Sequence, residues 1–216
     1  MDVKLARKLE LVVAVAGHRW DRIDRRHEPR LAEAVAACLA GIDRAAMGVS
    51  VSMLTGLAEG ADQVAASVMP PQWGLIAVLP MLREDYERHL LEHSTGDPAE
   101  AIGRLRRLLR RRGVRVIDAN LGSPEAGYLS IQSQILKAAD LMLVIWDGEA
   151  SAGQGGTTDT VVRALAREIP VLWIHTDQDR VPALQRVTAA SDQGAEISEI
   201  LKPSEMEKLV AGLVVE

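Results

Sequence analysis

The 216-residue chain has a single cysteine, no phenylalanine and only 3% aromatic residues. One cysteine excludes an internal disulfide framework and a cysteine-rich metal site, and Cys38 lies in an alanine- and leucine-rich stretch where a core thiol is expected. No apolar run approaches the roughly 18 residues of a membrane-spanning helix. The first residues also contain no signal-peptide core of clean length. We therefore expect a cytoplasmic protein with no membrane partner.

Basic residues are in the minority as well. The formal net charge is −5 at pH 7 and the pI is about 5.6. Nucleic-acid binders are usually basic, and single-strand binders need aromatic platforms on which bases stack. The composition therefore argues against nucleic acid as a partner. What is present, 48% hydrophobic and 25% charged residues, suffices for the buried core of one globular domain.

Short apolar runs alternate along the chain with longer stretches of helical periodicity. The strand-length runs are residues 11–16, 49–54, 75–79, 114–117, 141–146 and 171–175. The helical stretches are residues 29–47, 59–68, 98–112, 124–139 and 157–168. Nearly continuous apolar strands are typical of parallel sheets that helices cover on both faces. We predict an α/β protein with a doubly wound, mostly parallel, Rossmann-like sheet over residues 1–176.

The remaining residues, 177–216, have a more polar composition. They contain one amphipathic stretch, residues 203–213. We expect a C-terminal tail with a short helix, which either packs on the domain or belongs to a linker toward a further domain.

The loops that follow the strands are the candidates for a site, because ligands of doubly wound sheets bind beyond the carboxyl ends of the strands. Gly17, His18 and Arg19 follow the first strand. Glycine lets the backbone approach a ligand, and histidine and arginine donate hydrogen bonds to anions. The alternative is a turn that leads into a solvated polar loop.

The second loop has two glycines four residues apart, Gly56 and Gly60. At a strand-to-helix junction such glycines let backbone N–H groups face a phosphate. Glu59 and Asp62 are expected in the first helical turn, where the helix dipole favours acids. Either acid is also suited to hold ribose hydroxyls, as in dinucleotide-binding folds.

The third loop begins with Pro80, which closes the third strand. We expect Arg83 near the mouth of the site and Tyr86 stacked on a base. His89 and His93 stand four residues apart, but no third metal ligand accompanies them in the sequence, so a solvated pair is expected. No metal and no cofactor is predicted.

The fifth loop carries Asp147 and then a glycine-rich segment. The segment reads Gly153-Gln154-Gly155-Gly156-Thr157-Thr158-Asp159-Thr160. Glycines and hydroxyl residues at a helix start can cradle an anion, although the same hydroxyls also cap helices. The segment is neither a Walker A loop nor a Gly-x-Gly-x-x-Gly fingerprint.

Four of these segments together resemble the SLOG superfamily, which groups the Smf/DprA DNA-processing proteins with the LOG-type enzymes once called lysine decarboxylases. They are Val15-Ala16-Gly17-His18-Arg19, residues 54–62, Ala77-Val78-Leu79-Pro80 and Gly155-Gly156-Thr157. The greatest likeness is to a bacterial branch with a Gly-His-Arg first loop, over about residues 11–175. The resemblance implies a Rossmann-like fold and a nucleotide or nucleotide-derived ligand. For part of the superfamily it also implies a sensor role beside effector domains in bacterial conflict systems.

One departure from the family pattern bears on catalysis. LOG-type enzymes hydrolyse the N-glycosidic bond of nucleoside monophosphates and carry a Gly-Gly-x-Gly-Thr-x-x-Glu motif. Here Thr160 occupies the glutamate position, and the acid stands one residue earlier, at Asp159. A displaced, shorter carboxylate can still hold ribose while missing the geometry that activates water.

Two functions follow, and a third is disfavoured. The first is a sensor module for a nucleotide-like ligand. We expect His18 and Arg19 to neutralise the charge of the ligand, and Glu59 and Asp159 to hold its ribose. The phosphate would be held by Gly56, Gly60, Gly155, Gly156 and Thr157. The alternative is a nucleoside monophosphate phosphoribohydrolase or deoxyribosyltransferase-like enzyme in which Glu59 or Asp159 is the catalytic base or nucleophile. DNA binding is the third, and the acidic pI argues against it. A homo-oligomer is compatible with all three.

Overall fold

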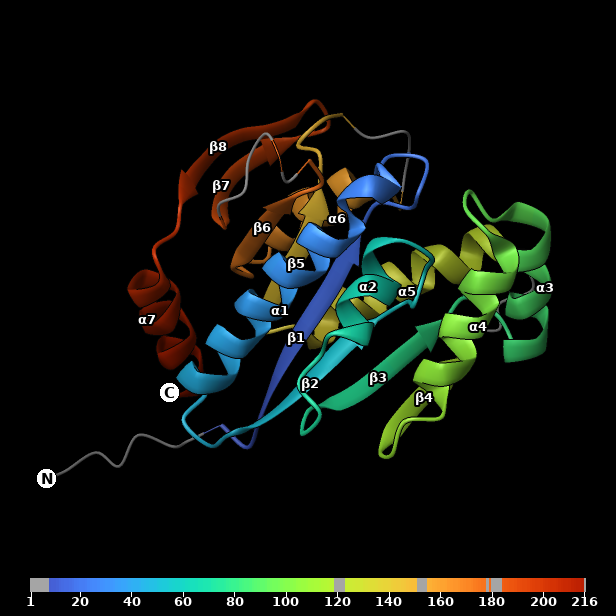
Figure 1. Cartoon of the computed structure of the whole chain (residues 1–216). Coiled ribbons are helices and arrows are strands. Elements are labelled where there is room, and N and C mark those ends of the chain that lie inside the picture. The colour runs from blue at the N-terminus through green and yellow to red at the C-terminus, as the bar shows by residue number, and fades with distance from the viewer. Residues whose placement is uncertain (1–7, 119–122, 151–154, 178, 180–183, 216) are drawn as a thin grey trace, which may run out of the picture.

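The computed structural model describes residues 8–118, 123–150, 155–177, 179 and 184–215. These residues form one eight-stranded sheet with helices on both faces (Figure 1). The strand order is β4-β3-β2-β1-β5-β6-β7-β8, with parallel pairing from β4 through β6 and antiparallel pairing beyond it. The predicted doubly wound, mostly parallel α/β fold is confirmed.

The elements match the predicted strands closely. The strands are β1 (Glu10–Gly17), β2 (Ser50–Thr55), β3 (Gly74–Leu79), β4 (Val114–Asp118), β5 (Leu141–Trp146), β6 (Val171–His175), β7 (Gln185–Ser191) and β8 (Gly194–Ile200). The helices are η1 (Arg25–His27), α1 (Glu28–Ala45), α2 (Ala61–Ser67), α3 (Arg83–His93), α4 (Pro98–Leu109), α5 (Pro124–Ala138), α6 (Thr157–Leu165) and α7 (Pro203–Val214).

Two hydrophobic clusters lie on the two faces of the sheet, and the handedness of the crossovers explains which helices join each. The connections after β1, β2 and β3 step in one direction and place α1, α2 and α4 on one face, whereas those after β4 and β5 step in the other and place α5 and α6 opposite. Parallel connections are right-handed, so a change of direction changes the face. The change occurs between β1 and β5, which is the switch point of the fold.

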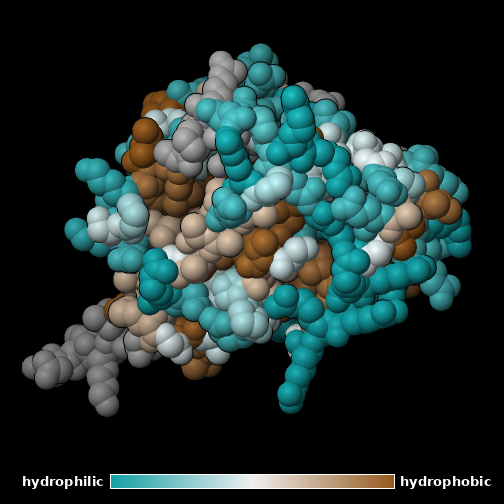
Figure 2. Space-filling model, in the orientation of Figure 1, coloured by the Kyte–Doolittle hydropathy of each residue, from teal (hydrophilic) through white to brown (hydrophobic). Residues whose placement is uncertain are grey.

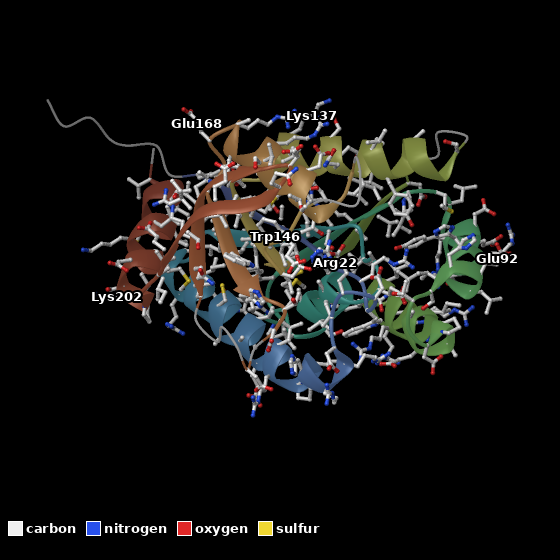
Figure 3. All side chains as sticks on the ribbon, turned by 90° about the horizontal axis from the view of Figure 1, so that it is seen from above. Arg22, Glu92, Lys137, Trp146, Glu168 and Lys202 are labelled. Atoms are coloured by element: carbon white, nitrogen blue, oxygen red, sulfur yellow. The ribbon has the colours of Figure 1, made fainter. Side chains whose placement is uncertain are left out.

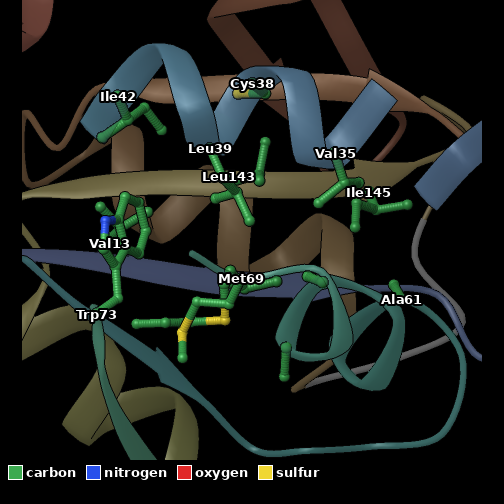
Figure 4. Packing of buried hydrophobic residues seen from close by; sticks show 14 of the residues in the cluster. Val13, Val35, Cys38, Leu39, Ile42, Ala61, Met69, Trp73, Leu143 and Ile145 are labelled. Carbon is green, nitrogen blue, oxygen red and sulfur yellow. The ribbon is translucent and has the colours of Figure 1, made fainter. Parts of the chain in front are cut away.

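Helix α1 packs its apolar stripe on the central strands. Val35 and Leu39 are fully buried, and they face Ile145 and Leu143 of β5, respectively (Figure 4). Each such side chain contributes about 1.5–3 kcal/mol by leaving water. Cys38 is buried in the same helix, and burial raises the pKa of its thiol to about 12. The expected core thiol is confirmed.

The C-terminal residues add more than the predicted short helix. β7 and β8 form a hairpin that extends the sheet from β6, and α7 packs on α1. Met206 of α7 lies so near Gly41 of α1 that a Cβ there would come within 2.2 Å of the Met206 methyl carbon. The sequence did not predict these two strands, because β8 is mostly exposed and so lacks an apolar run.

Helix α2 begins two residues later than predicted. Gly60 precedes it with φ +88°, a left-handed conformation that favours glycine. A Cβ on Gly60 would lie 2.6 Å from the backbone oxygen of His18, so the first and second loops touch through their backbones here. Asp62 lies in the first helical turn as expected, but Glu59 does not, because it precedes Gly60.

The surface differs between the two ends of the sheet. Figure 2 shows mostly hydrophilic surface over α3 and α4, while hydrophobic surface gathers toward β8, where Ile197 and Ile200 are exposed. Within the described residues, no helix combines the length and the apolar character that crossing a membrane requires.

Gly127 brings α5 against the end of β3, and this contact can be tested. A Cβ at Gly127 would lie 2.0 Å from the carbonyl oxygen of Pro80. We expect Gly127→Ala to lower the free energy of unfolding by about 1–3 kcal/mol, measured by urea denaturation, because α5 must shift. Gly212→Ala in α7 is the control, since a Cβ there meets nothing within 4 Å. Equal effects of the two substitutions would show that the close approach is not required.

Candidate functional site

A pocket of about 120 Å³ opens at the carboxyl ends of the strands, beside the switch point. The end of β1, the loop after β2, helix α3, helix α5 and the start of α6 all contribute to its wall. The lining residues are Val15, Ala16, Gly17, Gly56, Ala58, Asp62, Tyr86, Tyr128, Ile131, Gln132, Ile135, Gly155, Thr157 and Thr160. The pocket is smaller than the roughly 300–1,000 Å³ of whole-ligand sites, so it fits one part of a ligand and leaves the rest at the mouth.

Residues nominated from four separate loops meet in this pocket. The nominated residues that line it are Gly17, Gly56, Asp62, Tyr86, Gly155 and Thr157. Gly156 stands between two lining residues, and Gly153 and Gln154 lie outside the described residues. The sequence therefore identified the loops that converge, although ligand contact itself stays a prediction.

Ten nominated residues are not among those that line the pocket: His18, Arg19, Glu59, Gly60, Pro80, Arg83, Asp147, Gly156, Thr158 and Asp159. The Arg83 side chain is 46% exposed and pairs with Glu87 at 3.1 Å, so its expected place at the mouth stays a prediction. Thr158 is buried and donates its hydroxyl to the carbonyl oxygen of Glu149 at 2.9 Å. Pro80 abuts α5 through its backbone.

Glu59 is buried inside a network of protein donors. Its carboxylate accepts hydrogen bonds from Arg19 (Nη2, 2.7 Å), from the Ser94 hydroxyl and from the N–H and hydroxyl of Thr95. Burial raises the pKa of Glu59, but the bonds from Ser94, Thr95 and Arg19 outweigh it and hold the pKa below its ordinary value. The expected roles for Glu59 on ribose and Arg19 on phosphate therefore meet a constraint, because each side chain already binds the other.

His18 is held between two predicted site residues. Its Nε2 lies 2.9 Å from the Asp147 carboxylate, and its Nδ1 lies 3.4 Å from the Thr157 hydroxyl. Asp147 also pairs with Arg22 at 2.6 Å. Burial raises the pKa of Asp147, but His18, the Glu149 N–H and Arg22 together lower it to about 2. Asp147 directly follows Trp146, the last residue of β5, so this pair holds Arg22 at the end of that strand (Figure 3).

Asp159 is used to shape the loop before α6. Its carboxylate accepts hydrogen bonds from Gln132 (2.9 Å), Arg163 (2.8 Å) and the Gly155 N–H (3.1 Å). Burial raises the pKa of Asp159, but these hydrogen bonds lower it by more, so the pKa is below its ordinary value. Thr160, at the glutamate position of the LOG motif, lines the pocket in its place.

Asp62 is the acid that lines the pocket. Its side chain is buried, and its carboxylate accepts hydrogen bonds from the Thr55 hydroxyl and the N–H groups of Gly56 and Ala58. Burial raises the pKa of Asp62 to about 7 even though these bonds lower it. No ion pair to Asp62 is present among the described residues, and no lysine or arginine lines the pocket.

Helix α5 supplies the lining residues that sequence reasoning missed. Tyr128, Ile131, Gln132 and Ile135 all come from it. Helix α5 connects the edge strand β4 to β5, on the far side of β1. Its place beside β1 therefore depends on the strand order, which the sequence does not reveal. One signal was available: Tyr128 and Tyr86 are the only two tyrosines, and both line the pocket.

One set of described residues has three potential metal ligands close together: His27, Asp177 and Asp179. The two ring nitrogens of His27 face different carboxylates, at 3.6 Å and 3.2 Å, and Arg30 pairs with Asp179. This arrangement is an ion-pair network that joins the segment after β6 to α1. The ring centroids of His89 and His93 lie 4.6 Å apart with the rings tilted by 58°, and the His93 side chain is 58% exposed.

The Glu59 network predicts a pH-dependent contribution to stability. Because its pKa is lowered in the folded state, the contribution is present above the unfolded pKa and is lost as pH falls through the folded pKa. We expect Glu59→Gln to lower the free energy of unfolding by about 1–3 kcal/mol at neutral pH and less in acid. Glu92→Gln is the control, since the Glu92 side chain is 59% exposed. A loss in urea denaturation that does not shrink in acid would contradict the network.

Comparison with known proteins gives little beyond the fold. No protein-family model and no curated protein matches the chain. Among solved structures, it is similar to the X-ray structure of TM1055, a Northeast Structural Genomics Consortium target, at 15% sequence identity and a TM-score of 0.43. The similarity covers 74% of this chain and 72% of that one. The α/β assignment rests on the strand order above.

Proposed function

We propose that the chain is a nucleotide-binding sensor module of the SLOG type. The observation that carries this proposal is the convergence of the loops after β1, β2 and β5 in one pocket at the switch point of the sheet. Doubly wound sheets bind nucleotides at this position. The same loops hold the segments that resemble the superfamily.

The phosphate would sit at the start of α6. Gly155, Gly156 and Thr157 precede or open this nine-residue helix, whose first N–H groups and dipole favour an anion. No side chain caps these N–H groups at Gly156. The His18 imidazole lies beside the Thr157 hydroxyl, while Arg19 and Arg22 are bound to acids. One imidazole and one helix terminus suit a ligand of low negative charge.

The nucleoside part would enter the pocket between α3 and α5. Tyr86 and Tyr128 offer ring faces, and Ile131 and Ile135 complete an apolar wall. Aromatic and aliphatic walls with a few polar groups are typical of small-molecule sites, and tyrosine rings stack well on bases.

The hydrogen-bond partners of the nominated acidic residues favour binding over catalysis. Glu59 and Asp159, the two nominated catalytic residues, are both occupied by protein donors and do not line the pocket. An N-glycosidic-bond enzyme stays the alternative, and one observation favours it. Asp62 lines the pocket with a pKa of about 7, which suits a general acid or base at neutral pH.

The phosphate position can be tested at Gly156. Its φ of −75° is open to any residue, so Gly156→Asp adds bulk and negative charge without backbone strain. We expect roughly hundredfold weaker nucleotide binding by calorimetry, or none, with the fold retained. Gly212→Asp, which places the same charge in open space on α7, is the control. Unchanged affinity in Gly156→Asp would count against the phosphate position.

Turnover separates the sensor from the enzyme. We expect no free base and no ribose phosphate after long incubation of the protein with nucleoside monophosphates and deoxynucleosides, measured by chromatography. Robust product formation that Asp62→Asn, Glu59→Gln or Asp159→Asn cuts roughly a hundredfold would instead establish the enzyme, since that factor is usual for a general acid or base.

A further inference from the structure

The wall of the pocket contains one carboxyl group that no described cation neutralises. Asp62 is 6% exposed and lines the pocket. The Thr55 hydroxyl and the N–H groups of Gly56 and Ala58 bind its carboxylate. An ionised carboxylate has about four acceptor positions, so three protein donors leave room for one more.

Keeping a carboxyl group here costs the fold free energy. A buried acid without a cation is poorly solvated when ionised, and the pKa of Asp62 is raised to about 7 by that burial. Asparagine has nearly the same shape and avoids the charge. Groups that reduce stability at a pocket are characteristic of functional sites.

One neighbour, Gln132, extends the polar part of the pocket wall. Gln132 uses its side-chain amide nitrogen as donor to Asp159 and Thr160, at 2.9 Å each, and its carbonyl oxygen accepts from no group in the part of the chain that the structure describes. The polar side chains that line the pocket are thus two acceptors, Asp62 and the Gln132 carbonyl, and the hydroxyls of Tyr86, Tyr128, Thr157 and Thr160; none carries a positive charge.

We propose that Asp62, with the Gln132 carbonyl, holds a hydrogen-bond-donating group of the uncharged part of the ligand, either a ribose hydroxyl or an exocyclic amino group of a base. The phosphate then stays at the mouth, beside Thr157. The inference rests on the proposed function and adds which end of the nucleotide enters the pocket. A phosphate is unsuited to the pocket itself, because an ionised Asp62 would repel it at short range.

The proposal fixes the sign of a pH dependence. Only the ionised carboxylate accepts from a ligand donor without giving one back, so affinity should rise as pH passes through about 7. Tyr86 from α3 and Tyr128 from α5 face this region, and burial raises the pKa of both, so they stay neutral.

The other charged groups nearby are already paired. Arg19 pairs with Glu59 between the first and second loops, His18 pairs with Asp147 at the mouth, and Arg163 pairs with Asp159, which binds Gln132. All three pairs are retained in Asp62→Asn, as is the phosphate of the ligand. The difference between wild type and this variant therefore isolates the titration of Asp62.

Calorimetric titrations over about pH 5.5–8.5 test the proposal. The probes are adenosine 5′-monophosphate, its 2′-deoxy analogue, inosine 5′-monophosphate and ribose 5-phosphate. The proteins are wild type, Asp62→Asn and the surface control Asp85→Asn, whose carboxylate is 45% exposed on α3. We expect affinity in wild type and control to rise with pH by about tenfold more than in Asp62→Asn. Weaker binding of the 2′-deoxy analogue identifies the hydroxyl as donor, and weaker binding of the inosine nucleotide identifies the amino group.

Thermal unfolding of the same proteins tests whether Asp62 has a purely structural role. The raised pKa means that the folded state loses stability as pH rises from the unfolded value through about 7. Asp62→Asn should therefore unfold several degrees higher than wild type at alkaline pH and show no such gain in acid. A variant that is less stable at every pH would mark Asp62 as a structural residue and overturn the proposal.

Two further outcomes would overturn this proposal alone. One is a probe that binds wild type and Asp62→Asn with the same pH profile. The other is an affinity of wild type that falls with pH relative to the variant, which would show that a protonated carboxyl group donates to the ligand. If no probe binds wild type at any pH, this proposal and the proposed function fall together.

Discussion

The reversal of strand order between β1 and β5 is the constraint on which the site depends. Right-handed crossovers place α2 and α6 on opposite faces of the sheet on either side of this point. Their N-terminal loops consequently diverge above β1 and leave a gap that neither helix can fill. The pocket is that gap, and glycine is needed at its base: a Cβ on Gly17 would lie 2.5 Å from both Ala61 Cβ and the Ile145 carbonyl oxygen.

The charges near the gap are arranged so that most cancel one another. Arg19 binds Glu59, Arg22 binds Asp147, and Arg163 binds Asp159. Each pair ties one loop to another or to its own helix, so the loops that form the pocket are held by interactions that do not need a ligand. What is left uncancelled is small: the start of α6 and Asp62 inside the pocket. Such a preorganised site spends little of its binding energy on ordering loops.

Sequence reasoning succeeded where local pattern suffices. Continuous apolar runs identified β1, β2, β3, β5 and β6, which are mostly buried, and also the edge strand β4, although that strand is mostly exposed. β8 is mostly exposed as well but has no apolar run, and it gave no such signal. Glycine-rich junctions identified the loops that converge. The sequence could not show which acidic side chains remain available to a ligand. Glu59 and Asp159 look as suitable as Asp62 until the fold brings Arg19, 40 residues away, beside Glu59 and Gln132, 27 residues away, beside Asp159.

The contrast between Glu59 and Asp62 shows how one loop assigns opposite tasks to two acids. Both are buried within three residues of each other, but Glu59 points toward Arg19, Ser94 and Thr95 and is stabilised when ionised, whereas Asp62 meets only neutral donors and is destabilised. The turn at Gly60, with φ +88°, separates the two directions. A carboxylate that the protein satisfies fully can hold the fold together but has nothing to offer a ligand. A carboxylate left partly unsatisfied beside a pocket weakens the fold slightly, and that deficit is what a bound donor group can relieve.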